Sequence, residues 1–219
     1  MRVALHVWRV PRSEIGAAFF RLARDPRRLR SRPGVRFAKL LGTAGGFGPA
    51  DADWTRFAAI IVSEGEVAFE PPGVRARIEL TPLHSRGTWS GQAPFSPFSR
   101  DKPDGMVLAL TRARLRPAKA LTFWKAIPPV IEEVGAAPGL LARFGIGEAP
   151  IGWQGTVSVW RSTADLTSFA YRQPQHRAVI ARTPTDRWYA EELFARFAVR
   201  DVIGERAVLG WREGGQGER

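Results

Sequence analysis

The sequence contains no cysteine, and this absence excludes several kinds of chemistry at once. Disulfides, cysteine-ligated zinc, iron–sulfur clusters and thiolate nucleophiles all need a thiol that the chain does not have. Histidine is nearly as scarce, with His6, His84 and His176 as the complete set. These three are scattered and no carboxylate pattern accompanies them, so the sequence does not indicate a mononuclear metal site.

Long apolar runs are missing as well. A membrane-spanning helix needs about 20 consecutive apolar residues, and no such run occurs. The N-terminal stretch is interrupted by Arg2, His6 and Arg9, which is not typical of a signal peptide. The GxSxG, HExxH and P-loop motifs are also absent. We therefore expect a soluble, cytoplasmic, globular protein whose 44% hydrophobic residues build the core.

Acidic residues are few relative to basic ones, with 21 Asp and Glu against 33 Lys and Arg and a net charge of +12. Seven arginines lie between Arg21 and Arg36, and Asp25 is the sole acid among them. Such a cluster is typical of a solvated helix face. It is also compatible with docking to an anionic membrane or with attraction of an acidic redox partner. Nucleic-acid binding is not expected, because the aromatic strand motifs of RNA-reading sheets are absent.

Hydrophobic patterning and breaker residues predict the secondary structure. We predict strands at 2–10, 35–42, 54–62, 74–80, 106–114, 140–147, 152–160 and 194–202. We predict helices at 14–24, 117–127, 164–171 and 174–184, with a shorter one at 66–70 that Pro71 and Pro72 stop early.

The two halves of the chain repeat each other. Landmarks recur in the same order: Pro33-Gly34 and Pro138-Gly139, Trp54 and Trp153, and Thr81-Pro82 with Trp89 against Thr183-Pro184 with Trp188. Each half therefore follows the order β-α-β-β-α-β, which is ferredoxin-like. Because such a half leaves one apolar sheet face uncovered, we expect the two faces to pack together. The predicted fold class is α+β, two tandem ferredoxin-like (βαββαβ) halves packed as a pseudo-symmetric dimeric α/β-barrel.

This repeat also predicts a division of the chain. Residues 1–95 form the first half, 96–105 a linker, 106–203 the second half, and 204–219 a glycine-containing tail that we expect to be mobile at its end. The linker is long enough for the halves to pack within one chain or to swap between two. The second half has the fuller helix set and carries His176.

The predicted helix between Pro174 and Pro184 places His176 on an apolar stripe. His176, Val179 and Ile180 fall at i, i+3 and i+4, away from the arginines of the segment. A neutral imidazole facing an apolar space is a good ligand for haem iron. It is also a common buried structural residue, and geometry alone favours that second interpretation.

Polar side chains gather on one face of the strand at 153–160. Alternation puts Gln154, Thr156, Ser158 and Trp160 together and the apolar residues on the other face. We expect the apolar face to lie under the helices and the polar face to line the space between the sheets, as a wall for a ligand. An edge of the barrel open to water is an equally good interpretation.

Arginines on the neighbouring strands are candidates for binding a carboxylate ligand. Arg112 and Arg114 share a strand face, and Arg143 lies on an adjacent strand. They could pair with the propionates of a haem. Internal partners are equally available, namely Glu132, Glu148, Glu191 and Glu192. His6 and His84 are expected to be structural or exposed.

Five segments of the chain together resemble the spheroidene monooxygenase family of acyclic carotenoid 2-ketolases. They are RFAKLLGTA (36–44), RGTWSGQAPF (86–95), LTRARLRPAKALTFWKAIPP (110–129), APGLLARFGIGEAPIGWQGTVSVW (137–160) and YRQPQHRAVIARTPTDRWYAEELFARF (171–197). The resemblance implies a haem-dependent enzyme that uses O₂ and electrons from a reduced ferredoxin. It would oxidise an activated methylene of a carotenoid to a ketone through a hydroxylated intermediate. The chain is also similar to the wider group of dimeric α/β-barrel haem proteins.

The resemblance also implies roles for individual residues. His176 would be the axial metal ligand of haem b, with Arg112, Trp160 and Trp188 as further cofactor-binding residues. Ser158, Gln154 and Arg143 would act on the catalytic side. Residues 48–80 are not diagnostic of the family, so the substrate stays open beyond its being apolar. The alternatives are a haem protein of the same barrel group that breaks down haem or dehydrates an N–O compound, and a haem-free barrel that binds a small molecule or pigment.

Overall fold

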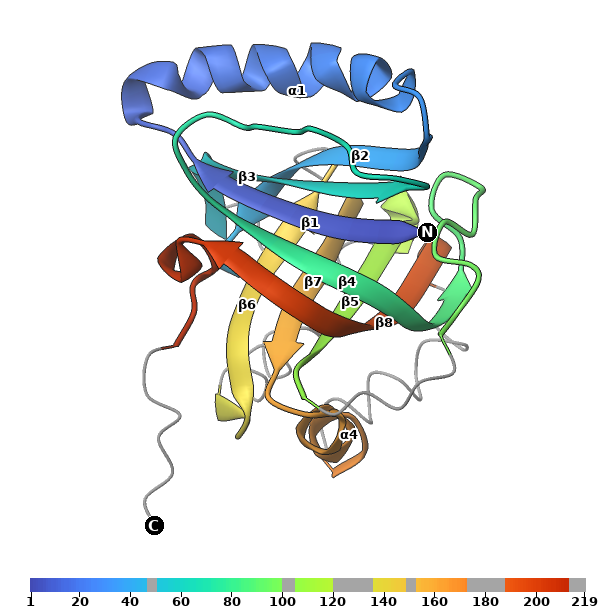
Figure 1. Ribbon diagram of the computed structural model, residues 1–219. Helices are drawn as coiled ribbons and strands as arrows, with labels where there is room; N and C mark the ends of the chain where they lie inside the picture. The colour runs from blue at the N-terminus through green and yellow to red at the C-terminus, as the bar shows by residue number, and fades with distance from the viewer. Residues whose placement is uncertain (47–50, 100–104, 120–135, 149–152, 173–187, 213–219) are drawn as a thin grey trace.

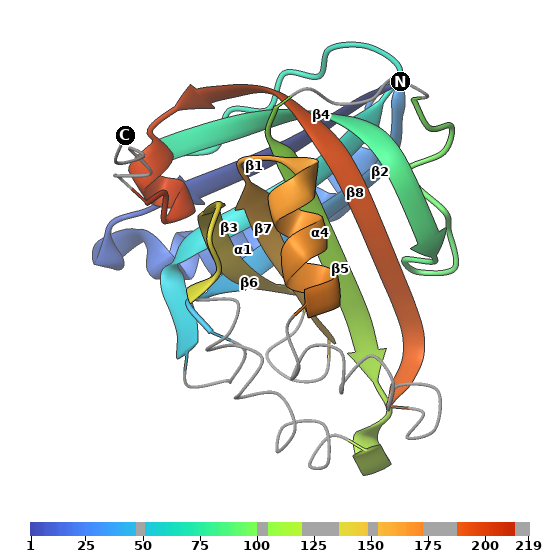
Figure 2. The same ribbon diagram turned by 90° about the horizontal axis from the view of Figure 1, so that it is seen from below.

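The computed structural model describes residues 1–46, 51–99, 105–119, 136–148, 153–172 and 188–212. Within these residues eight strands form a closed barrel in the order β1-β3-β2-β6-β7-β5-β8-β4 (Figures 1 and 2). Every neighbouring pair is antiparallel. The predicted α+β class and barrel of ferredoxin-like halves are therefore confirmed.

The elements have the following bounds. The strands are β1 Arg2–Arg9, β2 Val35–Ala44, β3 Ala52–Ser63, β4 Val74–Gly87, β5 Val107–Leu115, β6 Leu140–Gly147, β7 Trp153–Trp160 and β8 Tyr189–Gly204. The helices are α1 Ile15–Arg30 and α4 Thr163–Arg172, with short 3-10 turns η1 Arg12–Glu14, η3 Pro117–Lys119 and η4 Arg206–Leu209. The predicted helix with His176, most of the predicted helix at 117–127, part of the linker and the end of the tail lie outside the described residues.

The two halves have the same strand order. β4-β1-β3-β2 forms one half of the barrel and β8-β5-β7-β6 the other, and the halves join where β2 pairs with β6 and β4 pairs with β8. Both seams form within one chain, so the closed barrel needs no exchange of halves between two copies. The division of the chain at 96–105 stays a prediction.

The Pro-Gly landmarks of the sequence are equivalent in space. Gly34 and Gly139 each have φ of 77° and lie just before β2 and β6. A positive φ at both positions explains why glycine recurs there. The match of Trp89 with Trp188 is wrong, because Trp89 follows β4 whereas Trp188 precedes β8.

Several elements differ in length from the prediction. β4 continues past residue 80 to Gly87, because this part pairs with residues 193–198 of β8. β8 begins at Tyr189, because its first residues pair with the end of β5. α1 continues through Pro26 to Arg30, since Leu29 extends its buried stripe. No helix forms at 66–70, so the first half lacks its second predicted helix.

Side chains fill the interior of the barrel. Alternate residues of the strands, such as Val3 and Leu5 on β1 and Val157 and Val159 on β7, belong to one buried cluster. Trp89 joins this cluster after β4, and Leu209 joins it from η4 at the other end of the barrel (Figure 1). α1 lies outside the first half, and α4 lies against β7 on the opposite side of the barrel (Figure 1). In the described part of the chain no helix is long and apolar enough to cross a membrane.

Candidate functional site

The outer faces of the two halves differ in what fills them. Outside the first half, Trp8 and Phe57 are buried against α1 and the 66–70 segment, whose Phe69 ring lies 5.8 Å from that of Trp8. Outside the second half, β5 and β7 present small side chains that are only partly buried: Ala109, Thr111, Ala113, Thr156 and Ser158. We call these five residues the β5–β7 face. Among the described residues, the outer face of the first half is therefore covered by aromatic packing, whereas β5 and β7 carry smaller and more polar side chains on their outer face.

The polar side of β7 faces the helical layer and not the barrel interior, so this expectation from the sequence is wrong. Val157 and Val159 are in the interior cluster, which turns Thr156, Ser158 and Trp160 outward. Trp160 stacks on Phe169 of α4, with ring centroids 5.2 Å apart. The physical reason is closure: a closed barrel of eight strands has just enough interior space for side chains, so the apolar side of each strand turns inward.

Strand register brings two of the predicted catalytic residues together. Ser158 lies directly opposite Arg143 of β6 and, on its other side, opposite Ala109 of β5. Ser158 Oγ accepts a hydrogen bond of 2.9 Å from Trp160 Nε1. Gln154 belongs to β7 as well, but its side chain lies outside the described residues.

A pair of hydroxyl groups lies at the centre of the β5–β7 face. Thr111 and Thr156 are cross-strand partners, and their Oγ1 atoms share a hydrogen bond. Such a pair carries two hydroxyl protons, and the mutual bond uses one of them. The second proton is therefore available to an acceptor placed above the face.

Cationic groups flank the same face on both sides. Arg143 is partly buried, and burial, followed by the charge of Arg212, lowers its pKa. Arg196 of β8 lies opposite Ala109, at the other edge of the row that contains Ser158 and Arg143. Arg196 Nε is buried without a hydrogen-bond partner among the described residues. Because buried N–H groups are nearly always paired in native proteins, this atom indicates an acceptor still to be supplied.

Arg112 does not belong to the β5–β7 face, which corrects its expected role beside a ligand. Its position on β5 alternates with Thr111, and its side chain enters the barrel interior, where it is only 3% exposed. Arg112 forms ion pairs with Glu148, at 2.9 Å, and with Glu191. The internal carboxylates considered from the sequence are thus its partners.

The ion pairs of Arg112 belong to a buried cluster that closes one end of the barrel. Lys39 Nζ lies 2.6 Å from Glu148, and Trp89 Nε1 donates to the other oxygen of that carboxylate at 2.6 Å. Burial by itself raises the pKa of Glu191, but the Gly91 N–H, Arg112 and Thr88 outweigh it and lower that pKa to about 2. Two cations and two carboxylates therefore balance one another here.

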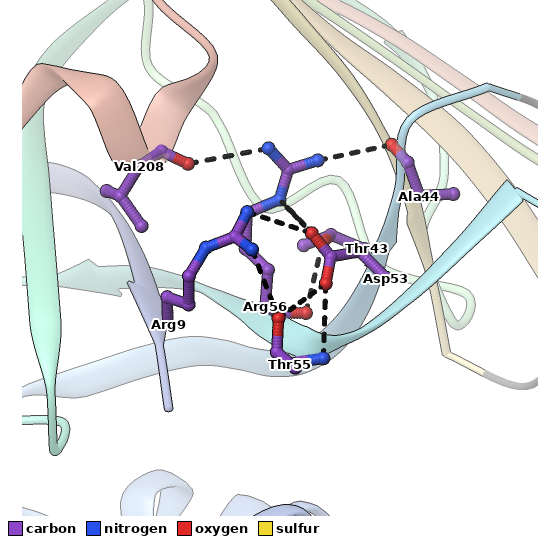
Figure 3. A network of polar contacts seen from close by, with 7 residues as sticks. All are labelled: Arg9, Thr43, Ala44, Asp53, Thr55, Arg56 and Val208. Carbon is purple, nitrogen blue, oxygen red and sulfur yellow. Dashed lines mark hydrogen bonds and ion pairs between the residues drawn. The ribbon is translucent and has the colours of Figure 1, made fainter. Parts of the chain in front are cut away.

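Another network lies at the other end of the barrel (Figure 3). Arg56 is buried, donates from Nε to Thr43 Oγ1 at 2.9 Å, and reaches the carbonyl of Val208 with Nη1 at 3.4 Å. Asp53 Oδ2 lies 3.0 Å from Arg9 Nη2. Burial by itself raises the pKa of Asp53, but the hydrogen bonds from Thr55 and the charges of Arg9 and Arg56 outweigh burial and lower that pKa, so the ionised carboxylate is stabilised. This network fastens η4 over the barrel end.

Comparison with known proteins places the chain in a family. No family model matches it. The spheroidene monooxygenase of Rhodobacter capsulatus is 36% identical over 201 residues, which is 84% of this chain and 82% of that protein. The spheroidene monooxygenase of Rubrivivax gelatinosus is 34% identical over 188 residues, covering 78% of this chain and 72% of the relative. The chain belongs to the spheroidene monooxygenase family.

Two solved structures superimpose well on this member of the spheroidene monooxygenase family. Aldoxime dehydratase OxdRE, crystallised with butyraldoxime, superimposes with a TM-score of 0.57 at 12% identity, covering 95% of this chain and 84% of that one. A second aldoxime dehydratase structure gives a TM-score of 0.55 at 8% identity, covering 93% of this chain and 84% of its own. At these identities the likeness shows a common fold.

The three histidines and Trp188 of this family member remain to be placed. His6 is buried against Phe69, with ring centroids 5.0 Å apart, and burial together with Arg77 lowers its pKa to about 4, so it is a neutral structural residue. His84 is exposed, as expected. Trp188 is buried just before β8, and His176 lies outside the described residues. The cofactor-binding roles of these last two stay predictions.

Sequence reasoning missed Thr111 and Arg196. Thr111 adjoins Arg112, which attracted attention for its charge, and Arg196 lies in a strand that was predicted without assigning its faces. Leu193, Ala195 and Phe197 are all in the interior cluster. That alternation is visible in the sequence and would have placed Arg196 on the outer face.

Proposed function

We propose that this protein is a haem-dependent monooxygenase that oxidises a carotenoid on the β5–β7 face. Membership of the spheroidene monooxygenase family supports a monooxygenase. The observation that carries the location is the contrast between the two outer faces. The first is filled by Trp8, Phe57 and Phe69, and the second presents small, partly buried side chains and hydroxyl groups.

The described residues fit a haem b on the β5–β7 face. A planar macrocycle needs a flat wall, and Ala109, Thr111 and Thr156 project little from their strands. Its two propionates leave from one edge of the macrocycle and need a cation there, and Arg143 and Arg196, at opposite edges of the face, are the two candidates. Arg196 in particular has a buried N–H that lacks an acceptor among the described residues. His176, which follows α4 in the chain, would hold the haem iron.

Each part of the face would have a distinct task. Haem would supply the activation of O₂, with electrons from a ferredoxin-type donor. The free proton of the Thr111–Thr156 pair would be donated to an oxygen atom above the face, and Ser158, which accepts from Trp160, has its own proton to donate. Trp160 and Phe169 would provide an apolar wall for a polyene and would exclude water.

The overall reaction balances as two oxygenations of one methylene. In the first, one atom of O₂ enters a C–H bond and the other becomes water, at the cost of two electrons and two protons. The second oxygenation of the same carbon gives a geminal diol, which loses water to form the ketone. The apolar substrate, O₂ and the donor are thus all required.

Labelled oxygen tests this proposal. The protein is supplied with haem, a spheroidene-type carotenoid in detergent micelles, reduced ferredoxin and ¹⁸O₂. We expect a ketone that carries ¹⁸O, because both oxygens of the diol derive from O₂. Formation of product without O₂, or the conversion of an aldoxime in its place, would contradict a monooxygenase. Dehydration of an N–O compound, the alternative within the same barrel group, needs no O₂.

A further inference from the structure

The outer face of α1 carries more positive charge than any internal partner accounts for. Five arginines lie on this helix, at positions 21, 24, 27, 28 and 30, and all are exposed. None of the five forms an ion pair within the part of the chain that the structure describes. The sole acid of the helix, Asp25, is partly buried beside the sheet-facing stripe.

Bulky apolar side chains stand among these charges. Phe20 is 63% exposed, the largest value for any large hydrophobic side chain in the described residues, and the Arg24 guanidinium lies 5.8 Å from its ring centroid. Phe19 and Trp54 contact each other beside it, with centroids 5.6 Å apart, and are 38% and 53% exposed. An exposed aromatic pair next to a third exposed ring is costly in water unless something covers it.

We propose that the outer face of α1 is a docking surface for an anionic phospholipid bilayer. Basic side chains are attracted to the negative surface of such a membrane, and aromatic rings are favoured at the level of the headgroups. An amphipathic helix that is rich in arginine, carries an exposed Phe20 and lies beside the exposed Trp54 of β3 meets both conditions. An acidic protein would be matched by the arginines alone and would leave Phe20 and Trp54 without a role.

The position of α1 determines what such docking achieves. α1 and α4 lie on opposite sides of the barrel, so a membrane bound to α1 leaves the α4 side uncovered (Figure 1). Docking therefore retains the enzyme at the bilayer surface and leaves the α4 side, with the β5–β7 face, accessible to a soluble electron donor. This purpose rests on the proposed function, whereas the binding itself does not.

Vesicle sedimentation tests the docking surface. The wild type is expected to sediment with vesicles of equal parts phosphatidylglycerol and phosphatidylcholine, and not with pure phosphatidylcholine. Arg24→Gln combined with Arg28→Gln should weaken binding about 25-fold, at about five-fold for each arginine near the surface. Phe20→Ala should weaken it about 10-fold through the lost apolar contact.

A matched control separates the surface from net charge. Arg2→Gln combined with Arg161→Gln removes the same charge from exposed arginines outside α1 and should leave vesicle binding unchanged. An equal loss in this control would overturn the proposal, as would no binding of the wild type to anionic vesicles. Binding of an acidic ferredoxin that the α1 variant loses, without vesicle binding, would assign the face to a protein partner and also overturn it.

A turnover assay distinguishes this inference from the proposed function. With carotenoid already dissolved in detergent micelles, the α1 variants should oxidise it at the wild-type rate. A failure of vesicle binding with normal turnover would remove the docking surface alone. A failure of turnover in the wild type would instead contradict the proposed function.

Discussion

Arg143 and Arg196 occupy the two edges of one row of residues across the second half, with Ser158 and Ala109 between them. A ligand carboxylate would supply the acceptor that Arg196 Nε lacks among the described residues. Arg112, on the inward side of β5, forms ion pairs with Glu148 and Glu191 through its two Nη atoms. Arg112 and Arg196 thus have different roles, because their side chains lie on opposite sides of the barrel wall.

Arg196→Gln should weaken the binding of haem to the apoprotein by about 10- to 100-fold, since a hydrogen bond to a charged group contributes about 1.5–3 kcal/mol. Optical titration of the apoprotein with haem measures this without any turnover. Arg196→Lys should recover part of the affinity. Arg112→Met should leave haem affinity nearly unchanged while lowering stability; a larger loss of affinity in Arg112→Met than in Arg196→Gln would reverse the assignment.

Glu191 gives stability a defined dependence on pH. Its pKa falls from an ordinary value of 4.5 to about 2 in the folded protein. Because the folded pKa is lowered, the contribution is complete above pH 4.5 and is lost as the pH falls towards 2. In urea unfolding, Glu191→Gln should therefore be clearly less stable than wild type at pH 7 and nearly equal at pH 2. Glu192→Gln is the control, and parallel pH profiles for wild type and Glu191→Gln would contradict the role.

At the scale of elements, the repeated Pro-Gly turns before β2 and β6 have different surroundings. A Cβ added at Gly34 would meet nothing within 4 Å, whereas one at Gly139 would lie 2.3 Å from the Asp165 carboxyl carbon. Asp165 is bonded to Ser162 Oγ at 2.8 Å, and Ser162 Oγ also accepts from the Asp165 N–H in the first turn of α4. The second-half turn is therefore coupled to α4, the helix whose Phe169 stacks on Trp160 of β7.

Gly34→Ala should destabilise the protein by about 1 kcal/mol, the strain of a positive φ for alanine. Gly139→Ala carries the same strain and must also displace Asp165, so it should cost distinctly more. Urea unfolding at neutral pH compares the two. Equal losses would show that α4 does not depend on the turn before β6.

Alternation in the sequence correctly predicted which residues of a strand share a face, but not which face turns into the barrel. The sets that contain Val157 and Ser158 on β7 were separated correctly, because side-chain parity is a local property of a strand. Which set turns inward depends on closure of the barrel through the β2–β6 and β4–β8 seams, which involves residues far apart in sequence. Non-local pairing also explains the added lengths, since β4 is extended along β8 and β8 is extended along β5.

At the scale of the whole molecule, side chains fill the barrel interior, and the proposed site lies on the outer side of the barrel wall. Charged networks around Arg112 and Arg56 close the two ends, and apolar side chains fill the space between them. The fold and its two-half organisation could be predicted from the repeated landmarks. The aromatic packing outside the first half could not, because it depends on how Phe69 and α1 pack against Trp8 and Phe57.

A visible spectrum of the haem-reconstituted protein tests the central proposal most directly. Wild type, His176→Ala and His84→Ala are compared, the last as an exposed-histidine control. We predict a Soret band in the wild type that is unchanged in His84→Ala and shifted or lost in His176→Ala. No band in any of the three, or the same band in all of them, would contradict a haem held by His176 against the β5–β7 face.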